Sequence, residues 1–247
     1  MKIGVCIDKV PETESELIIS EDNTSLSFTG KYIINPYDEY AVEEAVRTKE
    51  KLGGEICVIS VGDEQNKEII RKALAIGCDY AVLLKTDDRI DSLSVAKMLA
   101  SEIKKRNFDL VFFGKQKVDF DSAVTGKIVA DILDFNYLPP AVKLDITQKT
   151  ICAEIQTDNG VMSLETSSPA IITTQKGLNE PRYASLKGIM NAKKIPIEEI
   201  AADSAKSFCD ISSYKISSEK KVCKILNYSK DSVKELADFL KNESKDF

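Results

Sequence analysis

The chain of 247 residues contains no histidine and no tryptophan. The absence of histidine excludes the Ser-His-Asp triad, the Cys-His dyad and every metal site built on imidazole. Chemistry of its own would have to come from carboxylates, lysine, cysteine, tyrosine or a bound cofactor. We therefore expect no catalytic residue and no metal site in this chain.

Other absences bear on partners and compartment. No stretch reaches about 18 consecutive apolar residues, so we expect no membrane span. The N-terminus MKIGVCID is too short and too quickly acidic for a signal peptide. The six cysteines form no CxxC pair, and we interpret them as small buried side chains in a reducing compartment. These features predict a cytoplasmic protein, or one of the mitochondrial matrix if it is eukaryotic.

What is present is an ordinary globular composition with a mild acidic excess. Apolar residues make up 43% and charged residues 30%, which is typical of a folded domain. Lysine and arginine number 34 against 40 acidic residues, which gives a formal net charge of −6. An acidic surface argues against nucleic acid as a partner, because the phosphate backbone attracts basic surfaces.

The first half of the chain alternates predicted strands with predicted helices. Apolar runs predict strands at 3–7, 56–61, 80–84 and 110–113. Helical spacing predicts a helix from Asn35-Pro36 to Gly53-Gly54, and further helices at 64–76, 92–106 and 122–133. Residues 8–34 are irregular, with possible short strands at 17–19 and 26–28. This alternation predicts a doubly wound α/β fold with a mostly parallel sheet, which binds ligands where its strand order reverses.

The pattern changes after Pro139-Pro140. Short strands are predicted at 141–146, 151–156 and 161–165, which form a small antiparallel insertion, and 170–174 returns to the main sheet. Residues 177–200 are expected to be loop plus a short basic helix. Residues 201–222 are expected to be an extended arm, followed by an amphipathic helix at 231–241. We divide the chain into an α/β domain at 1–200 and a C-terminal arm and helix at 201–247.

The loop at 114–126 joins a predicted strand to a predicted helix. The start of a helix stabilises a phosphate with its unpaired amides, and Ser122 and Thr125 could add hydroxyl donors. Against this, Asp119 and Asp121 would repel a phosphate that they faced. The alternative is that Asp121 or Ser122 is an ordinary helix cap.

The segment at 176–194 mixes basic residues with apolar side chains, among them Leu186, Ile189 and Met190. An apolar anchor ringed by charge is typical of a docking surface. The alternative is a helix packed in the core with a solvated lysine face.

Three stretches carry a family resemblance. They are NPYDEYAVEEAVRTKE at 35–50, GKQKVDFDSAVTG at 114–126 and KGLNEPRYASLKGIMNAKKIPIEEI at 176–200. With these, residues 1–200 resemble the beta subunit of electron-transfer flavoprotein. The resemblance implies an adenine nucleotide alpha-hydrolase-like fold and a heterodimer whose alpha subunit holds most of the redox-active FAD. It also implies a structural AMP in this subunit and no catalysis by this subunit alone.

The implied electron donors are acyl-CoA dehydrogenases of fatty acid β-oxidation or other flavin dehydrogenases, and the implied acceptor is a quinone oxidoreductase. The residues implied for the nucleotide are Cys6, Asn35, Pro36, Tyr37, Asp38, Val61, Gly114, Lys115, Gln116, Asp119, Asp121, Ser122, Ala123, Val124 and Thr125. Tyr37 also resembles the aromatic residue near the partner's flavin. A recognition loop at about 183–194 is implied to dock dehydrogenases through Leu186, Ile189, Met190, Lys193 and Lys194. The arm at 201–247 is implied to contact the alpha subunit.

The chain departs from the family pattern at two positions. Val124 stands where the family usually has glutamine, and Ala123 where asparagine is common, which removes side-chain hydrogen bonds to the nucleotide. Some members are electron-bifurcating and hold a second FAD and NAD(H), and residues 10–13 resemble their N-terminal loop. We expect the single-flavin type, with the bifurcating type and a stand-alone adenine-nucleotide-binding protein as alternatives.

Overall fold

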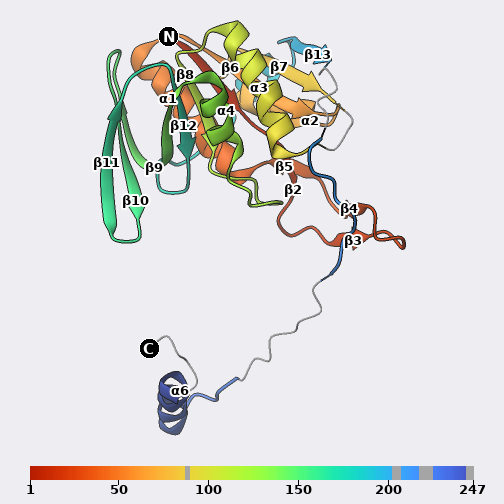
Figure 1. The fold of residues 1–247 in the computed structure, drawn as a ribbon, viewed down its shortest axis with the longest axis vertical. Helices are drawn as coiled ribbons and strands as arrows, with labels where there is room; N and C mark the ends of the chain where they lie inside the picture. The colour runs from red at the N-terminus through yellow and green to blue at the C-terminus, as the bar shows by residue number, and fades with distance from the viewer. Residues whose placement is uncertain (87–89, 202–206, 217–224, 243–247) are drawn as a thin grey trace. The chain divides into compact units, whose positions relative to one another are not determined.

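The computed structural model describes residues 1–86, 90–201, 207–216 and 225–242. The chain divides into two compact units, Met1–Tyr214 and Lys215–Phe247. The first contains the sheet and its covering helices, and the second contains a single described helix (Figure 1).

The first unit is built on a nine-stranded sheet in the order β11-β10-β9-β12-β8-β1-β6-β7-β13. The parallel strands are β1 (Lys2–Cys6), β6 (Glu55–Gly62), β7 (Tyr80–Lys85), β8 (Leu110–Gly114), β9 (Asn136–Ile146), β12 (Ala170–Thr174) and β13 (Ile197–Ala201). The hairpin of β10 (Ile151–Thr157) and β11 (Gly160–Thr166) extends one edge in antiparallel fashion. The predicted doubly wound sheet with a small antiparallel insertion is confirmed.

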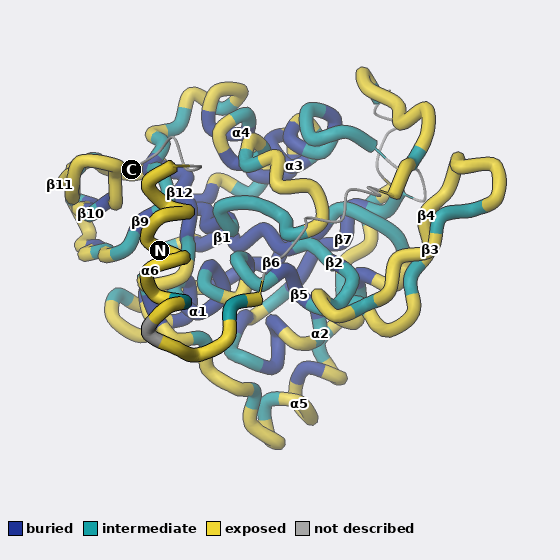
Figure 2. Tube along the Cα trace, turned by 90° about the horizontal axis from the view of Figure 1, so that it is seen from below, coloured by how far each residue is buried: buried dark blue, intermediate teal, exposed yellow. Residues whose placement is uncertain are grey.

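Helices cover both faces of the sheet, which explains why its central strands are continuous apolar runs. Helices α1 (Pro36–Leu52) and α2 (Asn66–Ile76) cover one face, while α3 (Ser92–Arg106) and α4 (Thr125–Leu133) cover the other (Figure 1). Successive side chains of β1 alternate between the two cores, so Val5 packs beneath α1 and α2 and Cys6 packs beneath α3 and α4. The buried strands and inner helix faces stand out against the exposed hairpins and α5 in Figure 2.

The start of the helix predicted at 122–133 is wrong. Asp121 and Ala123 have φ angles of 52° and 51°, which break a right-handed helix, and α4 begins only at Thr125. Val124 precedes the helix, and no side chain caps it. The interpretation of Asp121 or Ser122 as the cap is therefore wrong as well. The helix predicted at 64–76 likewise begins two residues later than expected, at Asn66.

The strand predicted at 141–146 is longer than expected and begins at Asn136. The strand runs through Pro139-Pro140. On one side of these prolines the pairing with β12 shifts register between Ile172 and Thr174, and on the other side β10 pairs only with residues 141–146. Proline is tolerated where ladder hydrogen bonds are interrupted or on an open side.

Two sets of short elements complete the first unit. The strands predicted at 17–19 and 26–28 are confirmed as the antiparallel pair β3 (Leu17–Ile19) and β4 (Leu26–Phe28). The pair β2 (Lys9–Pro11) and β5 (Tyr32–Ile34) was not predicted. In 177–200 the short helix is α5 (Leu186–Ala192), but the prediction missed β13, which pairs with β7 at the sheet edge.

The C-terminal helix is confirmed as α6 (Lys230–Asn242). The predicted arm is described only at 201 and 207–216, where 207–216 contains neither helix nor strand, while 202–206 and 217–222 lie outside the described residues. None of the helices in the described ranges is long and apolar enough to cross a membrane.

The cysteines do not all follow the expectation of burial. Cys6, Cys57 and Cys78 are buried, whereas Cys152 and Cys209 are exposed. Cys152 lies on the β10–β11 hairpin, where one sheet face is open to solvent. Cys223 lies outside the described residues.

Candidate functional site

The strand order reverses between β1 and β8. From β1 the chain passes to β6 and β7 on one side and then crosses to β8 on the other. The carboxyl ends of β1 and β8 therefore flank the crevice in which doubly wound sheets bind ligands. The loops that follow both strands meet the start of α1 at this place.

Asn35 connects these three segments. Its side chain is fully buried, and its Nδ2 donates to the carbonyl oxygen of Gln116 at 2.9 Å and to Oδ1 of Asp38 at 3.0 Å. Its Oδ1 accepts from the amide of Val118 at 3.2 Å. The asparagine that opens α1 thus fixes the course of the loop after β8.

Asp38 is buried beneath the same loop. Its Oδ2 accepts from the amide of Asp8 at 2.8 Å, which ties α1 to the end of β1. Burial raises the pKa of Asp38 to about 7, against the lowering effect of the hydrogen bonds from Asn35 and from the Asp8 amide. A Cβ on Gly114 would lie 2.2 Å from Oδ1 of Asp38, so only glycine allows β8 to pass so close to α1.

Lys117 provides the positive charge of the crevice. Its Nζ lies 2.7 Å from Oδ2 of Asp8 and 3.3 Å from Oδ2 of Asp119. Burial acts against the charged ammonium, but the two carboxylates raise the pKa of Lys117 above its ordinary value. One lysine is therefore shared between two carboxylates, and it offsets the negative charge of Asp119 only in part.

The end of β6 forms the opposite rim. Nδ2 of Asn66 donates to Oγ of Ser60 at 2.9 Å and to the carbonyl oxygen of Val61 at 3.3 Å. Oδ1 of Asn66 is buried and accepts no hydrogen bond from any described residue. An unpaired buried acceptor is costly, which makes this atom a candidate to receive a donor from a ligand.

The residues implied for a nucleotide lie in two groups. Asn35, Asp38, Gly114 and Gln116 contact one another, and Cys6 and Val61 lie at the ends of neighbouring strands. Residues 121 and 122 lie farther along the loop, where Asp121 accepts from Nε2 of Gln116 at 2.6 Å and Oγ of Ser122 lies 3.3 Å from that of Ser92 on α3. Asp8, after the end of β1, and Lys117, in the loop at 114–126, lie in segments that the sequence predicts to face the crevice, whereas Asn66, after the end of β6, was not selected.

A second feature lies away from the crevice, at α5. Tyr183, Leu186 and Met190 are 99%, 83% and 65% exposed, and Lys193 and Lys194 are exposed as well. Among the residues of α5 only Ala192 is buried, so the alternative of a helix packed in the core is wrong. We call residues 183–194 the docking segment.

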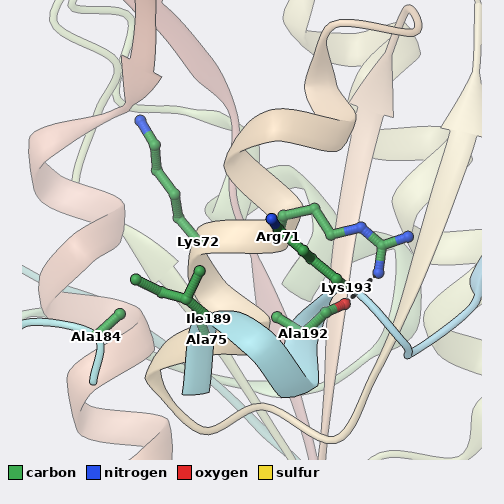
Figure 3. A pocket seen from close by; sticks show the side chains of 7 residues that line it. All are labelled: Arg71, Lys72, Ala75, Ala184, Ile189, Ala192 and Lys193. Carbon is green, nitrogen blue, oxygen red and sulfur yellow. Dashed lines mark hydrogen bonds between the residues drawn. The ribbon is translucent and has the colours of Figure 1, made fainter. Parts of the chain in front are cut away.

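The docking segment is attached to α2. A Cβ on Gly188 would lie 2.2 Å from the carbonyl oxygen of Ala75, so glycine permits α5 to approach α2 closely. The guanidinium of Arg71 donates to the carbonyl oxygens of Ala192 and Ile195. A hollow of about 390 Å³ remains between the helices (Figure 3). It is lined by Arg71, Lys72, Ala75, Ala184, Ile189, Ala192 and Lys193.

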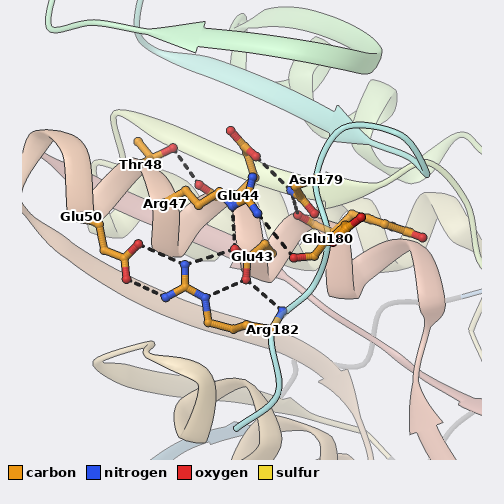
Figure 4. Close-up of polar contacts among 9 residues, drawn as sticks. Glu43, Glu44, Arg47, Thr48, Glu50, Asn179, Glu180 and Arg182 are labelled. Atoms are coloured by element: carbon orange, nitrogen blue, oxygen red, sulfur yellow. Dashed lines mark hydrogen bonds and ion pairs between the residues drawn. The ribbon is translucent and has the colours of Figure 1, made fainter.

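A polar network attaches the preceding residues to α1 (Figure 4). The guanidinium of Arg182 contacts Glu43 at 2.9 and 3.1 Å and Glu50 at 2.6 and 3.0 Å, and the backbone amide of Arg182 donates to Glu43 at 3.2 Å. We call Arg182, Glu43 and Glu50 the Arg182 clamp. Nearby, Nδ2 of Asn179 donates to the carbonyl oxygen of Tyr40 at 3.0 Å and to Glu44 at 2.9 Å.

The described residues form a doubly wound α/β protein with a crevice where the strand order reverses and a separate exposed apolar face at α5. The model of the electron transfer flavoprotein domain matches residues 25–205. The chain is 39% identical over 206 residues to the electron transfer flavoprotein subunit beta of Bacillus subtilis, covering 82% of this chain and 80% of that protein.

Two further relatives have the same name. The subunit beta of Syntrophomonas wolfei is 34% identical over 247 residues, covering 95% of this chain and 98% of the relative. The human subunit beta is 37% identical over 206 residues, covering 81% of each chain. The chain belongs to the beta subunits of the electron transfer flavoprotein family. The resemblance predicted from the three sequence stretches is confirmed.

Proposed function

We propose that this chain pairs with an electron transfer flavoprotein alpha subunit, holds AMP in the crevice between β1 and β8, and docks flavin dehydrogenases through the docking segment. Electrons then reach the FAD held mainly by the alpha subunit and pass to an acceptor such as a quinone oxidoreductase. The observation that carries the docking role is the exposure of Leu186, 83%, on a helix fixed to α2. A large apolar side chain held out in solvent is typical of an interface anchor.

The crevice has groups that suit an adenylate. α4 begins without a side-chain cap, so its first amides are available to a phosphate, and the hydroxyl of Thr125 lies at the same turn. Lys117 reduces the negative charge of Asp8 and Asp119, and the unpaired Oδ1 of Asn66 suits a donor such as an amino group or ribose hydroxyl. Val124 and Ala123 offer no polar side chain, so phosphate contacts here rest on the backbone.

The FAD would supply the redox chemistry when bound, and this chain would supply position. Tyr37 lies at the start of α1, half-buried, and its carbonyl oxygen accepts from Oγ1 of Thr174 at 3.2 Å. We propose that this residue faces the flavin of the partner. Burial raises the pKa of Cys6 well above its ordinary value, so this thiol stays neutral and does not act as a nucleophile.

The ligand content of the purified heterodimer tests the proposal. Coexpression with an electron transfer flavoprotein alpha subunit should give a yellow complex, and mass spectrometry of released nucleotides should find one FAD and one AMP. Two FAD together with flavin reduction by NADH would instead show the bifurcating type. A stable, colourless monomer that does not bind the alpha subunit would favour the stand-alone adenine-nucleotide-binding protein.

Docking is tested with Leu186→Ala in that heterodimer. We expect KM for the carrier to rise about tenfold in reduction by an acyl-CoA dehydrogenase, because truncating an interface anchor costs about 1.4 kcal/mol or more. Flavin content should not change. Val161→Ala is the matched control, since Val161 is 63% exposed on the distant strand β11. Equal KM values for the two variants would contradict the assignment of Leu186.

A further inference from the structure

The Arg182 clamp places a buried charge next to the docking segment. Glu43 is only 2% exposed, and it accepts from three groups of Arg182 and from Nε of Arg47 at 2.6 Å. Removing a carboxylate from water is costly, and an apolar pair of similar size often stabilises a fold at least as well as a buried ion pair. Stability alone therefore does not account for this arrangement. A guanidinium that binds two carboxylates through its planar fork is held in one orientation, and so is the backbone that carries it.

The clamp lies immediately before the exposed side chains. Tyr183 follows Arg182 directly, Ser185 caps α5 by accepting from the amide of Gly188 at 3.0 Å, and Leu186 begins the helix. On the far side, α5 is held by its close approach to α2 at Gly188. The exposed Tyr183 and Leu186 thus lie in the sequence between two fixed points, Arg182, which binds α1, and Gly188, which approaches α2.

We propose that the Arg182 clamp is a positioning device, which holds the docking segment in the conformation that a flavin dehydrogenase receives. This inference rests on the proposed docking function. A loop ordered before binding loses less conformational entropy when the complex forms, so the clamp acts on the affinity of the encounter. Because the clamp acts on the encounter, the electron-transfer step within the complex should be unchanged.

The test removes the pair without leaving a buried charge. In the heterodimer, Glu43→Met with Arg182→Met replaces both ions by side chains of similar length that suit an apolar interior. With an acyl-CoA dehydrogenase reduced by its substrate, we expect KM for the carrier to rise about tenfold, with kcat, flavin content and thermal midpoint retained. Amide hydrogen exchange in 183–194 should become faster. The matched control is Lys143→Met with Glu154→Met, which removes the exposed 2.6 Å pair between β9 and β10.

Leu186→Ala in the same assay distinguishes a failure of the clamp's positioning role from a failure of the proposed docking function. If Leu186→Ala raises KM and the folded double variant does not, the clamp only holds the chain together and the inference is overturned. If neither variant changes KM, the proposed docking function fails and the inference fails with it. Arg182→Lys provides a further check: it keeps the charge but loses the fork, so we expect KM between those of the wild type and the double variant.

Discussion

Asp38 is a carboxyl group in a place where a charge is unfavourable. Its position beneath Gly114 buries it, and the two hydrogen bonds it accepts do not restore the hydration that it loses. In the unfolded chain its pKa is about 3.9, whereas in the folded chain it is about 7. The folded state therefore binds more protons than the unfolded state between these two values.

This difference predicts how stability depends on pH. Because the folded state holds the proton more tightly, the contribution of Asp38 to the free energy of unfolding should fall as pH rises from about 4 to about 7, by on the order of 4 kcal/mol. Asp38→Asn should flatten the curve in this interval, as measured by urea unfolding between pH 4.5 and about 8. Asp121→Asn, at an exposed carboxylate, is the control. Parallel curves for wild type and Asp38→Asn would contradict the prediction.

At the same scale, the sequence revealed the site in part. Asn35, Asp38 and Gly114 could be selected because they lie in family stretches at a strand end and a helix start. Lys117 lies in a family stretch too, but its pairing with Asp8 could not be predicted, and Asn66 could not be selected, because both contacts join residues more than fifty positions apart in the sequence. Arg182 lies in the stretch at 176–200, but nothing in the sequence predicts its ion pair with Glu43.

At the scale of elements, the close contact of α5 with α2 depends on a single missing side chain. Gly188→Ala places a Cβ 2.2 Å from the carbonyl oxygen of Ala75, and a backbone oxygen cannot turn aside as a flexible side chain can. α5 must therefore move away from α2, even though alanine favours helix by about 1 kcal/mol over glycine.

The expected result of Gly188→Ala is a loss of about 1–3 kcal/mol of unfolding free energy together with faster amide exchange in α5. Asn191→Ala, on an exposed position of the same helix, tests whether a general change in helix propensity is responsible. Unchanged exchange in Gly188→Ala would show that α5 does not depend on this contact.

The elements that the sequence predicted well are those buried on both faces. Strands such as β1 and β8 are short continuous apolar runs, which is the pattern of a strand covered on both faces. β13 was missed because IEEIA is half-exposed at a sheet edge, so its pattern is not that of a buried strand. The start of α4 was misplaced because Asp121 and Ala123 have positive φ angles, and alanine gives no sign of such a conformation in the sequence.

At the scale of the whole molecule, the second unit offers an apolar face of its own. Val233, Leu236, Phe239 and Leu240 of α6 are 68%, 47%, 49% and 36% exposed. Their spacing places Val233, Leu236 and Leu240 along one side of the helix. We propose that this side packs against the alpha subunit, as the implied arm contact requires.

Deleting residues 215–247 should therefore raise the dissociation constant for the alpha subunit at least about tenfold, while unit Met1–Tyr214 keeps its fold. Analytical ultracentrifugation measures the first effect, and circular dichroism checks the second. Leu236→Lys with Leu240→Lys in the full chain should weaken association to a similar degree. If both variants bind the alpha subunit as tightly as the wild type, the assignment of residues 215–247 to the subunit interface is contradicted.

The sheet separates two cores, and the docking segment rests on one of them, whereas the crevice is bordered by elements of both. Leu178, Ala184 and Ala192 pack into the core with α1 and α2, which carries the docking segment, whereas Val129 and Ala130 of α4 belong to the opposite core, next to the loop of the crevice. Changes in the core beneath α3 and α4 should therefore leave the docking segment intact, whereas changes in the core of α1 and α2 affect the docking segment and the crevice together. Over evolutionary time, a lineage with new electron donors is therefore expected to differ first in the exposed side chains of the docking segment, above a core that it inherits unchanged.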